Sequence, residues 1–249
     1  MKHLLEICCA DLESVAVAND AGADRIELCS ALSVGGLTPS YGMVSEAVRM
    51  SRIPVNVLIR PREGDFVYTQ AEGLCMLSDI EACSSAGASG VVIGALNPDR
   101  SIDTAICSLL ASKAKGLGMT VTFHRAFDLC CNPSGALETI ISMGCDRVLT
   151  SGQQSSATKG AKLLRQLVGQ ADGRIIIMPG AGVNSHVIAD LAAETRAKEF
   201  HASAKKNIGS LMQSDGKQVS MGAADSEDYI RSTANPTEVL KLSEIIHNL

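Results

Sequence analysis

At 249 residues and 46% hydrophobic content, the chain is large and apolar enough to bury one sizeable core. A formal net charge of −5, with no basic run carrying interleaved aromatics, argues against nucleic acid or membrane as a partner. No segment has the roughly 18 to 20 apolar residues of a membrane span, and Glu6 and Asp11 interrupt the early apolar run. We therefore expect a cytosolic protein.

Short apolar segments alternate with helical patterns along the chain. The segments are short and rich in β-branched residues, as is typical of parallel strands covered on their outer side. Strands are predicted at 4–8, 24–29, 54–59, 90–93, 119–124, 146–150, 174–178 and 198–202. Helices are predicted at 12–21, before Met50, and at 70–86, 102–115, 133–143, 157–170, 185–194 and 236–247.

Eight strand–helix units in strict alternation favour an α/β fold of the (β/α)8 TIM barrel type over an open doubly wound sheet. No GxGxxG motif follows the first strand, which weakens the dinucleotide-binding alternative. We find no linker, so residues 1–249 are predicted to form a single domain.

One long segment, residues 203–235, separates the eighth predicted strand from the last helix. It is rich in Ser, Gly, Lys and Asp, and no element is predicted within it. A loop of this length in a compact domain usually has a function or is mobile. We expect it to cover the mouth of the barrel or to carry a subunit contact.

Polar side chains gather at the carboxyl ends of the predicted strands. Side chains alternate between the barrel interior and the helix layer, which places Glu6 and Cys8 inside on the first strand. Glu27 and Cys29 are placed inside on the second strand in the same way. Barrel enzymes have their sites at this face, so one shared pocket is predicted. The third, fifth and eighth strands contribute Arg60, His124 and His201.

His124, Arg125 and Asp128 follow an apolar strand within five residues, a costly arrangement unless the groups are paired or used. A histidine can act as a general acid or base because its ordinary pKa is close to neutrality. The alternatives are a His124 hydrogen-bonded to a carboxylate, and buried ion pairs of Glu6 and Glu27 with Arg60. The candidate catalytic residues are His124, Glu6, Glu27, Arg60 and Asp128.

Two glycine-bearing loops after the sixth and seventh strands suit an anion. Backbone N–H groups in such loops, and at the helix predicted to follow Gly182, bind phosphate or carboxylate. Barrels often bind phosphate with the loops after strands seven and eight. The candidate anion-binding residues are Arg62, Arg125, Ser151, Gly152, Gly180, Gly182 and His201.

The nine cysteines include no CxxC pair, and in a reducing compartment we expect free thiols. Cys8 and Cys29 are predicted on neighbouring parallel strands, roughly 4.8 Å apart, so their thiols could bind one soft ion such as Cu(I). The alternative is that both are small hydrophobic residues that fill the barrel.

Several stretches, in order over residues 5 to 204, form one recognisable set of motifs. They are Leu5–Cys8, Gly22–Cys29, Gly35–Ser40, Ile59–Arg62 with Gly64–Phe66, Thr122–Asp128, Arg147–Gly152, Gly180–Gly182, Glu199–His201 and Ser203–Ala204. Together these motifs resemble those of the CutC copper homeostasis protein family. Glu63 departs from the family pattern, which usually has glycine at this position.

This resemblance implies a (β/α)8 barrel, a cytosolic homodimer or homotetramer, and a role in copper handling with Cys8 and Cys29 as ligands. The alternative hypothesis is an enzyme that uses acid/base chemistry on a small anionic or phosphorylated metabolite. In that case His124 would work with Glu6 or Glu27. Arg60, Arg62 and the loop at 180–182 would hold the substrate.

Overall fold

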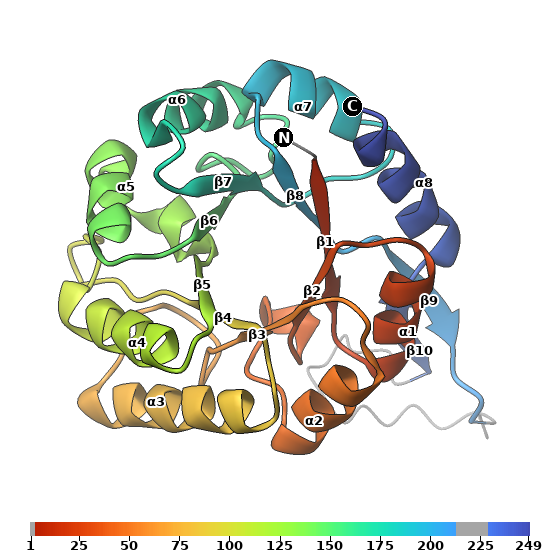
Figure 1. The fold of residues 1–249 in the computed structure, drawn as a ribbon, viewed down its shortest axis with the longest axis horizontal. Coiled ribbons are helices and arrows are strands. Elements are labelled where there is room, and N and C mark those ends of the chain that lie inside the picture. The colour runs from red at the N-terminus through yellow and green to blue at the C-terminus, as the bar shows by residue number, and fades with distance from the viewer. Residues whose placement is uncertain (1–2, 213–228) are drawn as a thin grey trace.

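Eight parallel strands form the centre of the molecule in a computed structural model, which describes residues 3–212 and 229–249. Neighbours pair in the order β7-β6-β5-β4-β3-β2-β1-β8, and β7 and β8 lie side by side, so that the ring is nearly closed (Figure 1). The predicted TIM barrel is confirmed. The strands are β1 (Leu4–Cys9), β2 (Arg25–Leu28), β3 (Val55–Leu58), β4 (Gly90–Ile93), β5 (Thr120–Phe123), β6 (Arg147–Thr150), β7 (Ile176–Pro179) and β8 (Glu199–Ala202).

The helices surround this ring and cover the outer face of every strand (Figure 1). Outward strand residues such as Leu5, Ile7 and Ile26 are fully buried between strands and helices. Each such side chain stabilises the fold by about 1.5–3 kcal/mol. The helices are α1 (Leu12–Asp20), α2 (Tyr41–Met50), α3 (Gln70–Ser85), α4 (Thr104–Gly116), α5 (Pro133–Ser142), α6 (Ala161–Ala171), α7 (Ile188–Thr195) and α8 (Pro236–His247), with 3-10 turns η1 (Leu32–Val34) and η2 (Arg125–Leu129).

Two helices begin at least three residues later than the sequence predicted. Helix α6 starts at Ala161, because residues 157–160 form turns in which Ala157 N–H donates to Ala181 O at 2.9 Å. Helix α7 starts at Ile188, because Glu238 of α8 accepts from both Ser185 N–H at 2.7 Å and Ser185 Oγ at 2.9 Å. The loop at 180–182 therefore does not lead directly into a helix.

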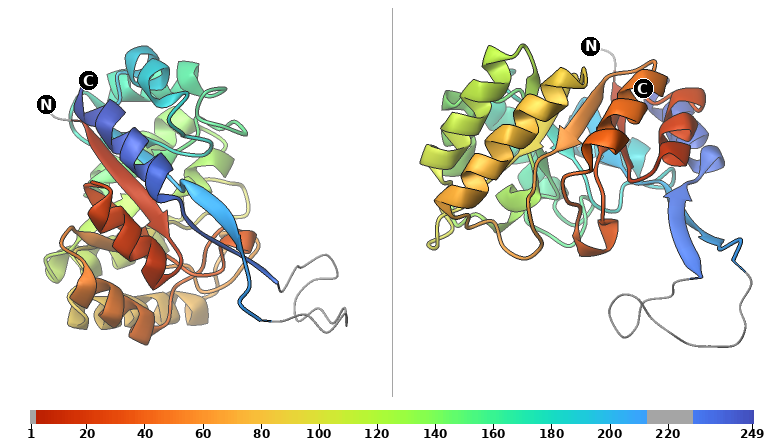
Figure 2. Two further views of the ribbon diagram at one scale, coloured as in Figure 1. Left: turned by 90° about the vertical axis from the view of Figure 1, so that its right-hand side faces the viewer. Right: turned by 90° about the horizontal axis from the view of Figure 1, so that it is seen from below.

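The segment 203–235 is not the element-free loop that was predicted. It contains β9 (Lys205–Gly209) and β10 (Ile230–Ala234), an antiparallel pair that projects from the barrel (Figure 2). The base of this pair is fixed to α1, since Ala234 N–H donates to Ser14 Oγ at 2.9 Å. Residues 213–228, where the rest of the predicted loop falls, lie outside the described residues.

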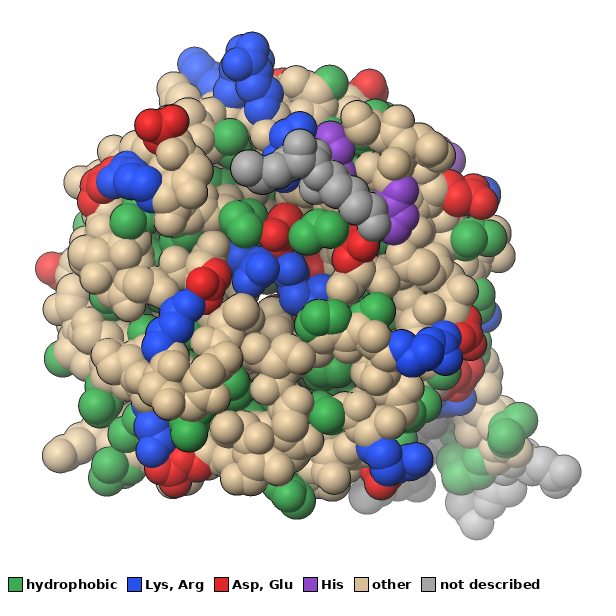
Figure 3. Space-filling model, viewed as in Figure 1, with side chains coloured by type: hydrophobic (Ala, Val, Ile, Leu, Met, Phe, Trp, Pro, Cys, Tyr) green, Lys and Arg blue, Asp and Glu red, His purple; other side chains and the backbone are tan. Residues whose placement is uncertain are grey.

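An ionic network occupies the barrel interior near the amino ends of the strands. Arg25 Nε donates to Glu6 Oε2 at 2.5 Å, and Arg25 Nη2 donates to Glu199 Oε2 at 2.6 Å. Arg147 Nε adds a second bond to Glu199 Oε2 at 2.7 Å. Basic and acidic side chains also gather at the centre of this face in Figure 3.

This network corrects the predicted pairing of Glu6 and Glu27 with Arg60. Strand register sets Glu6 opposite Arg25, whereas Arg60 follows the end of β3 at the other end of the barrel. Arg25 lies two residues before Glu27 and so shares its inward face. The alternation rule could have placed Arg25 inside, but only the register identifies its partners.

Candidate functional site

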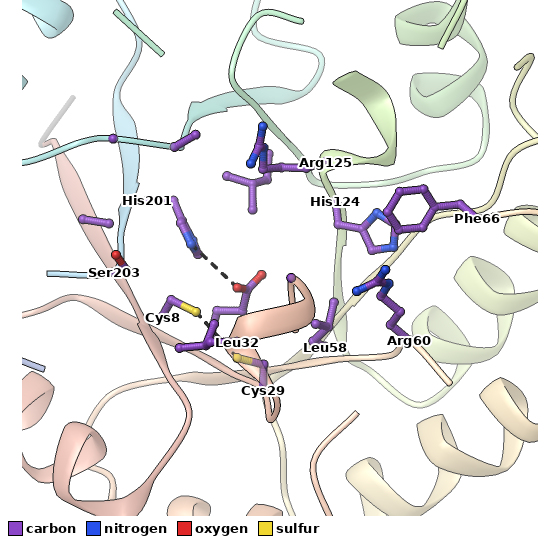
Figure 4. A pocket seen from close by; sticks show the side chains of 16 residues that line it. Cys8, Cys29, Leu32, Leu58, Arg60, Phe66, His124, Arg125, His201 and Ser203 are labelled. Atoms are coloured by element: carbon purple, nitrogen blue, oxygen red, sulfur yellow. Dashed lines mark hydrogen bonds and ion pairs between the residues drawn. The ribbon is translucent and has the colours of Figure 1, made fainter. Parts of the chain in front are cut away.

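A cavity of about 210 Å³ opens at the carboxyl ends of the strands. That is room for several water molecules or a small metabolite. Apolar residues that the sequence did not single out, among them Leu32, Phe66 and Leu149, also line the cavity, as does Ser203. The predicted residues brought together on its wall are Cys8, Glu27, Cys29, Arg60, Arg125, His124, Gly182 and His201 (Figure 4).

Two thiols meet on one side of the cavity. Cys8 is in β1 and Cys29 directly follows β2, and their Sγ atoms are 3.6 Å apart. Leu58 and Val92 pack against them, and both cysteines are buried. The neighbouring Cys29 thiol and burial together raise the pKa of Cys8 well above its usual value. Without a bound ion, Cys8 is therefore a neutral thiol at physiological pH.

His201 lies beside this thiol pair, between two carboxylates. Its Nδ1–H donates to Glu6 Oε1 at 2.8 Å, and its Nε2 lies 3.7 Å from Glu27 Oε2. Burial works to lower the pKa of His201, but Glu27, Cys8 and Glu6 raise it well above the ordinary value. Burial raises the pKa of Glu27, while Arg25 and His201 outweigh burial at Glu6 and lower its pKa to about 2.

The donor atoms of Cys8, Glu27 and His201 all lie within 4.8 Å of one another, a spacing that could hold a metal ion. Cys29 extends this group, since its sulfur is in contact with that of Cys8. Thiolates and imidazole are the ligand types that Cu(I) prefers in proteins. The residues on this side of the cavity therefore fit a soft metal ion.

His124 lies on the other side of the cavity, against Phe66, with the ring centroids 4.9 Å apart. Its Nδ1 accepts from Ala126 N–H at 3.1 Å, which leaves the ring proton on Nε2. Burial first, and then the charge of Arg60, lower the pKa of His124 to about 3. A neutral imidazole at physiological pH suits hydrogen-bond donation better than the acid/base role predicted from the sequence.

Arg60 is buried beside His124, and its guanidinium lies 5.1 Å from the centroid of the Phe66 ring. Its Nη1 donates to Val34 O and Gly36 O at 2.8 Å each, and its Nη2 donates to Gly64 O at 2.9 Å. Arg60 thus holds the loops that follow β2 and β3 against each other at the cavity wall.

Arg62, predicted to bind an anion, lies outside the residues that line the cavity. Its Nε pairs with Glu72 Oε1 at 2.6 Å and its Nη2 pairs with Asp65 Oδ1 at 3.0 Å. The chain turns between Arg62 and Asp65 at Gly64, which has a φ of +88°, a value that favours glycine. Glu63 has no positive φ, so its departure from the family glycine is compatible with this turn.

Asp128 already occupies the predicted anion loop after β6. Its carboxylate accepts from Ser151 N–H at 3.0 Å, from Gln153 N–H at 3.2 Å and from the Thr150 hydroxyl at 2.5 Å. Gly152 N–H donates to Thr150 Oγ1 at 2.9 Å. The N–H groups of Ser151 and Gly152, predicted to bind an external anion, are thus used internally by an acidic side chain and a hydroxyl.

The glycine loop after β7 has two different parts. Gly180 N–H donates to Thr150 O at 3.0 Å, and a Cβ at Gly180 would lie 2.5 Å from Leu149 Cδ1, so this glycine serves close packing. Ala181 and Gly182, with φ values of 74° and 75°, line the cavity. Only this second part of the predicted loop faces a possible ligand.

Fold and cavity together define the class: a (β/α)8-barrel protein with a buried thiol pair and a polar cavity at the carboxyl ends of its strands. The CutC family model matches residues 3–206, and the chain belongs to the CutC family. A family protein CutC of Parabacteroides distasonis is 50% identical over 225 residues, which are 90% of this chain and 92% of that protein.

Solved structures agree with this assignment. A CutC structure from Streptococcus agalactiae, whose name assigns it provisionally to copper homeostasis, is 32% identical, has a TM-score of 0.76, and matches 81% of this chain and 98% of its own. The phosphoribosylanthranilate isomerase of Pyrococcus furiosus, at 13% identity and a TM-score of 0.58, matches 99% of this chain and 100% of its own. That likeness shows the fold alone.

Within residues 3–212 and 229–249, the helices are too short or too polar for any of them to cross a membrane.

Proposed function

We propose that the protein binds Cu(I) through the thiolates of Cys8 and Cys29, with His201 as a third ligand, and serves copper homeostasis. The observation that carries this proposal is the 3.6 Å contact between the two Sγ atoms. Family membership supports the same function, since the name of the CutC structure from Streptococcus agalactiae assigns that protein provisionally to copper homeostasis.

The geometry requires little movement to hold one ion. Two sulfurs that each lie roughly 2.3 Å from a metal ion at a tetrahedral angle are about 3.8 Å apart. That spacing is close to the 3.6 Å between Cys8 Sγ and Cys29 Sγ. Glu6 fixes the ring of His201 through Nδ1, which leaves Nε2 directed to the cavity side where Cys8 and Glu27 lie. A carboxylate behind a metal-binding histidine is the usual arrangement for fixing its tautomer.

A Cu(I) titration against a competing chelator tests the proposal. The double variant Cys8→Ala, Cys29→Ala is expected to lose high-affinity Cu(I) binding. A matched control is Cys83→Ala, Cys107→Ala, which removes two other buried free thiols away from the cavity. Unchanged affinity in the first variant, or an equal loss in both, would rule the site out.

We also propose that the protein is cytosolic and that it associates with itself as a homodimer or homotetramer, as the resemblance to CutC proteins implies. Light scattering on the purified protein measures the subunit number, and a monomer at micromolar concentration would contradict this part.

A further inference from the structure

The side of the cavity opposite the thiols contains a buried cation, the guanidinium of Arg60. Only 5% of the surface of Arg60 is exposed, and Arg60 forms no ion pair with any of the described residues. Three backbone carbonyls accept from its Nη atoms, and the Tyr68 hydroxyl, another neutral group, lies close enough to interact with Arg60. Carbonyl dipoles satisfy hydrogen bonds but do not neutralise a charge, and an uncompensated buried charge is costly.

Arg62, two residues after Arg60 in the loop that follows β3, shows how this chain pairs a similar group. Arg62 stacks on Tyr68 at 5.2 Å, as Arg60 stacks on Phe66 at 5.1 Å. Yet Arg62 is more exposed and has two carboxylate partners, Glu72 and Asp65. Arg60, the more deeply buried of the two, has no carboxylate partner among the described residues, and it lines the cavity.

His124 adds an unused donor to the same side of the cavity. Only 5% of the surface of His124 is exposed, and its Nε2 has no hydrogen-bond partner in the part of the chain that the structure describes. Because Nδ1 accepts from Ala126 N–H, Nε2 carries the proton. A buried donor left without an acceptor costs about 1–3 kcal/mol. Nε2 has almost no accessible surface, so a ligand oxygen would recover that free energy once a small movement of the ring turns Nε2 to the cavity.

The rest of the cavity wall near these groups is also suited to an anion. The N–H groups of Ala181 and Gly182 make no hydrogen bonds within the described part of the chain, and both residues line the cavity. Arg125 stands at the rim, with Nε paired to Asp128 and Nη2 bonded to Ser151 Oγ. Glu27, the acidic residue in the lining, lies beside His201 and Cys8 on the thiol side.

We propose that Arg60, His124 and the loop at Ala181–Gly182 form a binding site for the carboxylate or phosphate group of a small metabolite. Arg60 provides the positive charge, His124 Nε2–H and the loop provide hydrogen bonds, and Phe66 forms an apolar wall. This site goes beyond the proposed copper function and uses none of its ligands.

Inorganic phosphate and acetate are the probes, with chloride at equal ionic strength as the control. Phosphate or acetate is expected to raise the melting temperature of the wild-type protein in a saturable manner. In His124→Phe, which keeps the ring volume but lacks the donor, we expect binding weakened about tenfold or more. Arg62→Gln, outside the cavity, is expected to bind as the wild type does.

A second measurement requires no variant. In ¹⁵N-detected imidazole spectra of the wild-type protein, the Nε2 resonance of His124 is expected to shift as phosphate is added. The proposal is overturned if neither anion stabilises the wild type beyond chloride, if His124→Phe responds equally, or if the His124 resonance does not move. The double variant Cys8→Ala, Cys29→Ala is expected to bind phosphate normally, so failure of either proposal is recognised separately.

Discussion

Removing Arg25 tests how strongly the ionic network stabilises the barrel interior. Arg25→Met keeps most of the aliphatic stem but removes the charge between Glu6 and Glu199. Among the described residues, Glu6 then keeps only His201 as an ion-pair partner and Glu199 only Arg147. Both carboxylates are buried, so each loses a charged partner that water cannot replace. Breaking a buried ion pair from one side costs about 3–5 kcal/mol.

For a chain of this size that loss corresponds to a fall in Tm of about 6–20 °C. Urea denaturation of the wild type and the variant, followed by circular dichroism, measures the difference in the free energy of unfolding. The control is Arg49→Met, which breaks an exposed pair with Glu46 and is expected to cost far less, because water screens an exposed ion pair. If Arg25→Met costs no more than Arg49→Met, the network does not hold the barrel interior as described.

Two further predictions concern His124. In Gly94→Ala the new Cβ would lie 2.5 Å from His124 Cε1, so we expect the ring to be displaced. The rise in melting temperature that phosphate causes should then be smaller. An unchanged rise would show that the position of the ring does not matter for phosphate binding. The folded-state pKa of about 3 lies below the unfolded value near 6.5, so the unfolded chain binds more protons and stability falls as pH drops from 6.5 toward 3. Between pH 6.5 and 5 this group lowers the free energy of unfolding by about 2 kcal/mol. Urea denaturation at both pH values should therefore show a smaller fall in the free energy of unfolding for His124→Phe than for the wild type. An identical pH dependence in the two proteins would contradict the lowered pKa.

The fold was predictable because every strand and helix has a local pattern. Apolar strands such as 90–93 and capped helices such as α1, in which Asp11 accepts from Ser14 N–H, need no distant information. The hairpin of β9 and β10 was missed because its strands are polar and largely exposed, which removes the apolar signal of a strand.

The candidate site was only partly predictable, for a physical reason. Alternation along a strand identifies the inward residues, and it correctly placed Cys8, Cys29 and His201 on one cavity. It contains no information about which inward residues meet. Strand register decides the partners of Glu6, and the path of η2 decides that Asp128 accepts hydrogen bonds from the loop after β6. Both are set by the packed structure.

X-ray absorption spectroscopy of the Cu(I)-loaded protein tests the central claim most directly, because it counts the atoms bound to the metal. We predict two sulfur atoms and one imidazole nitrogen in the wild type, loss of the nitrogen in His201→Ala, and loss of stoichiometric copper in Cys8→Ala, Cys29→Ala. A spectrum unchanged by these substitutions would place the copper elsewhere and contradict the account.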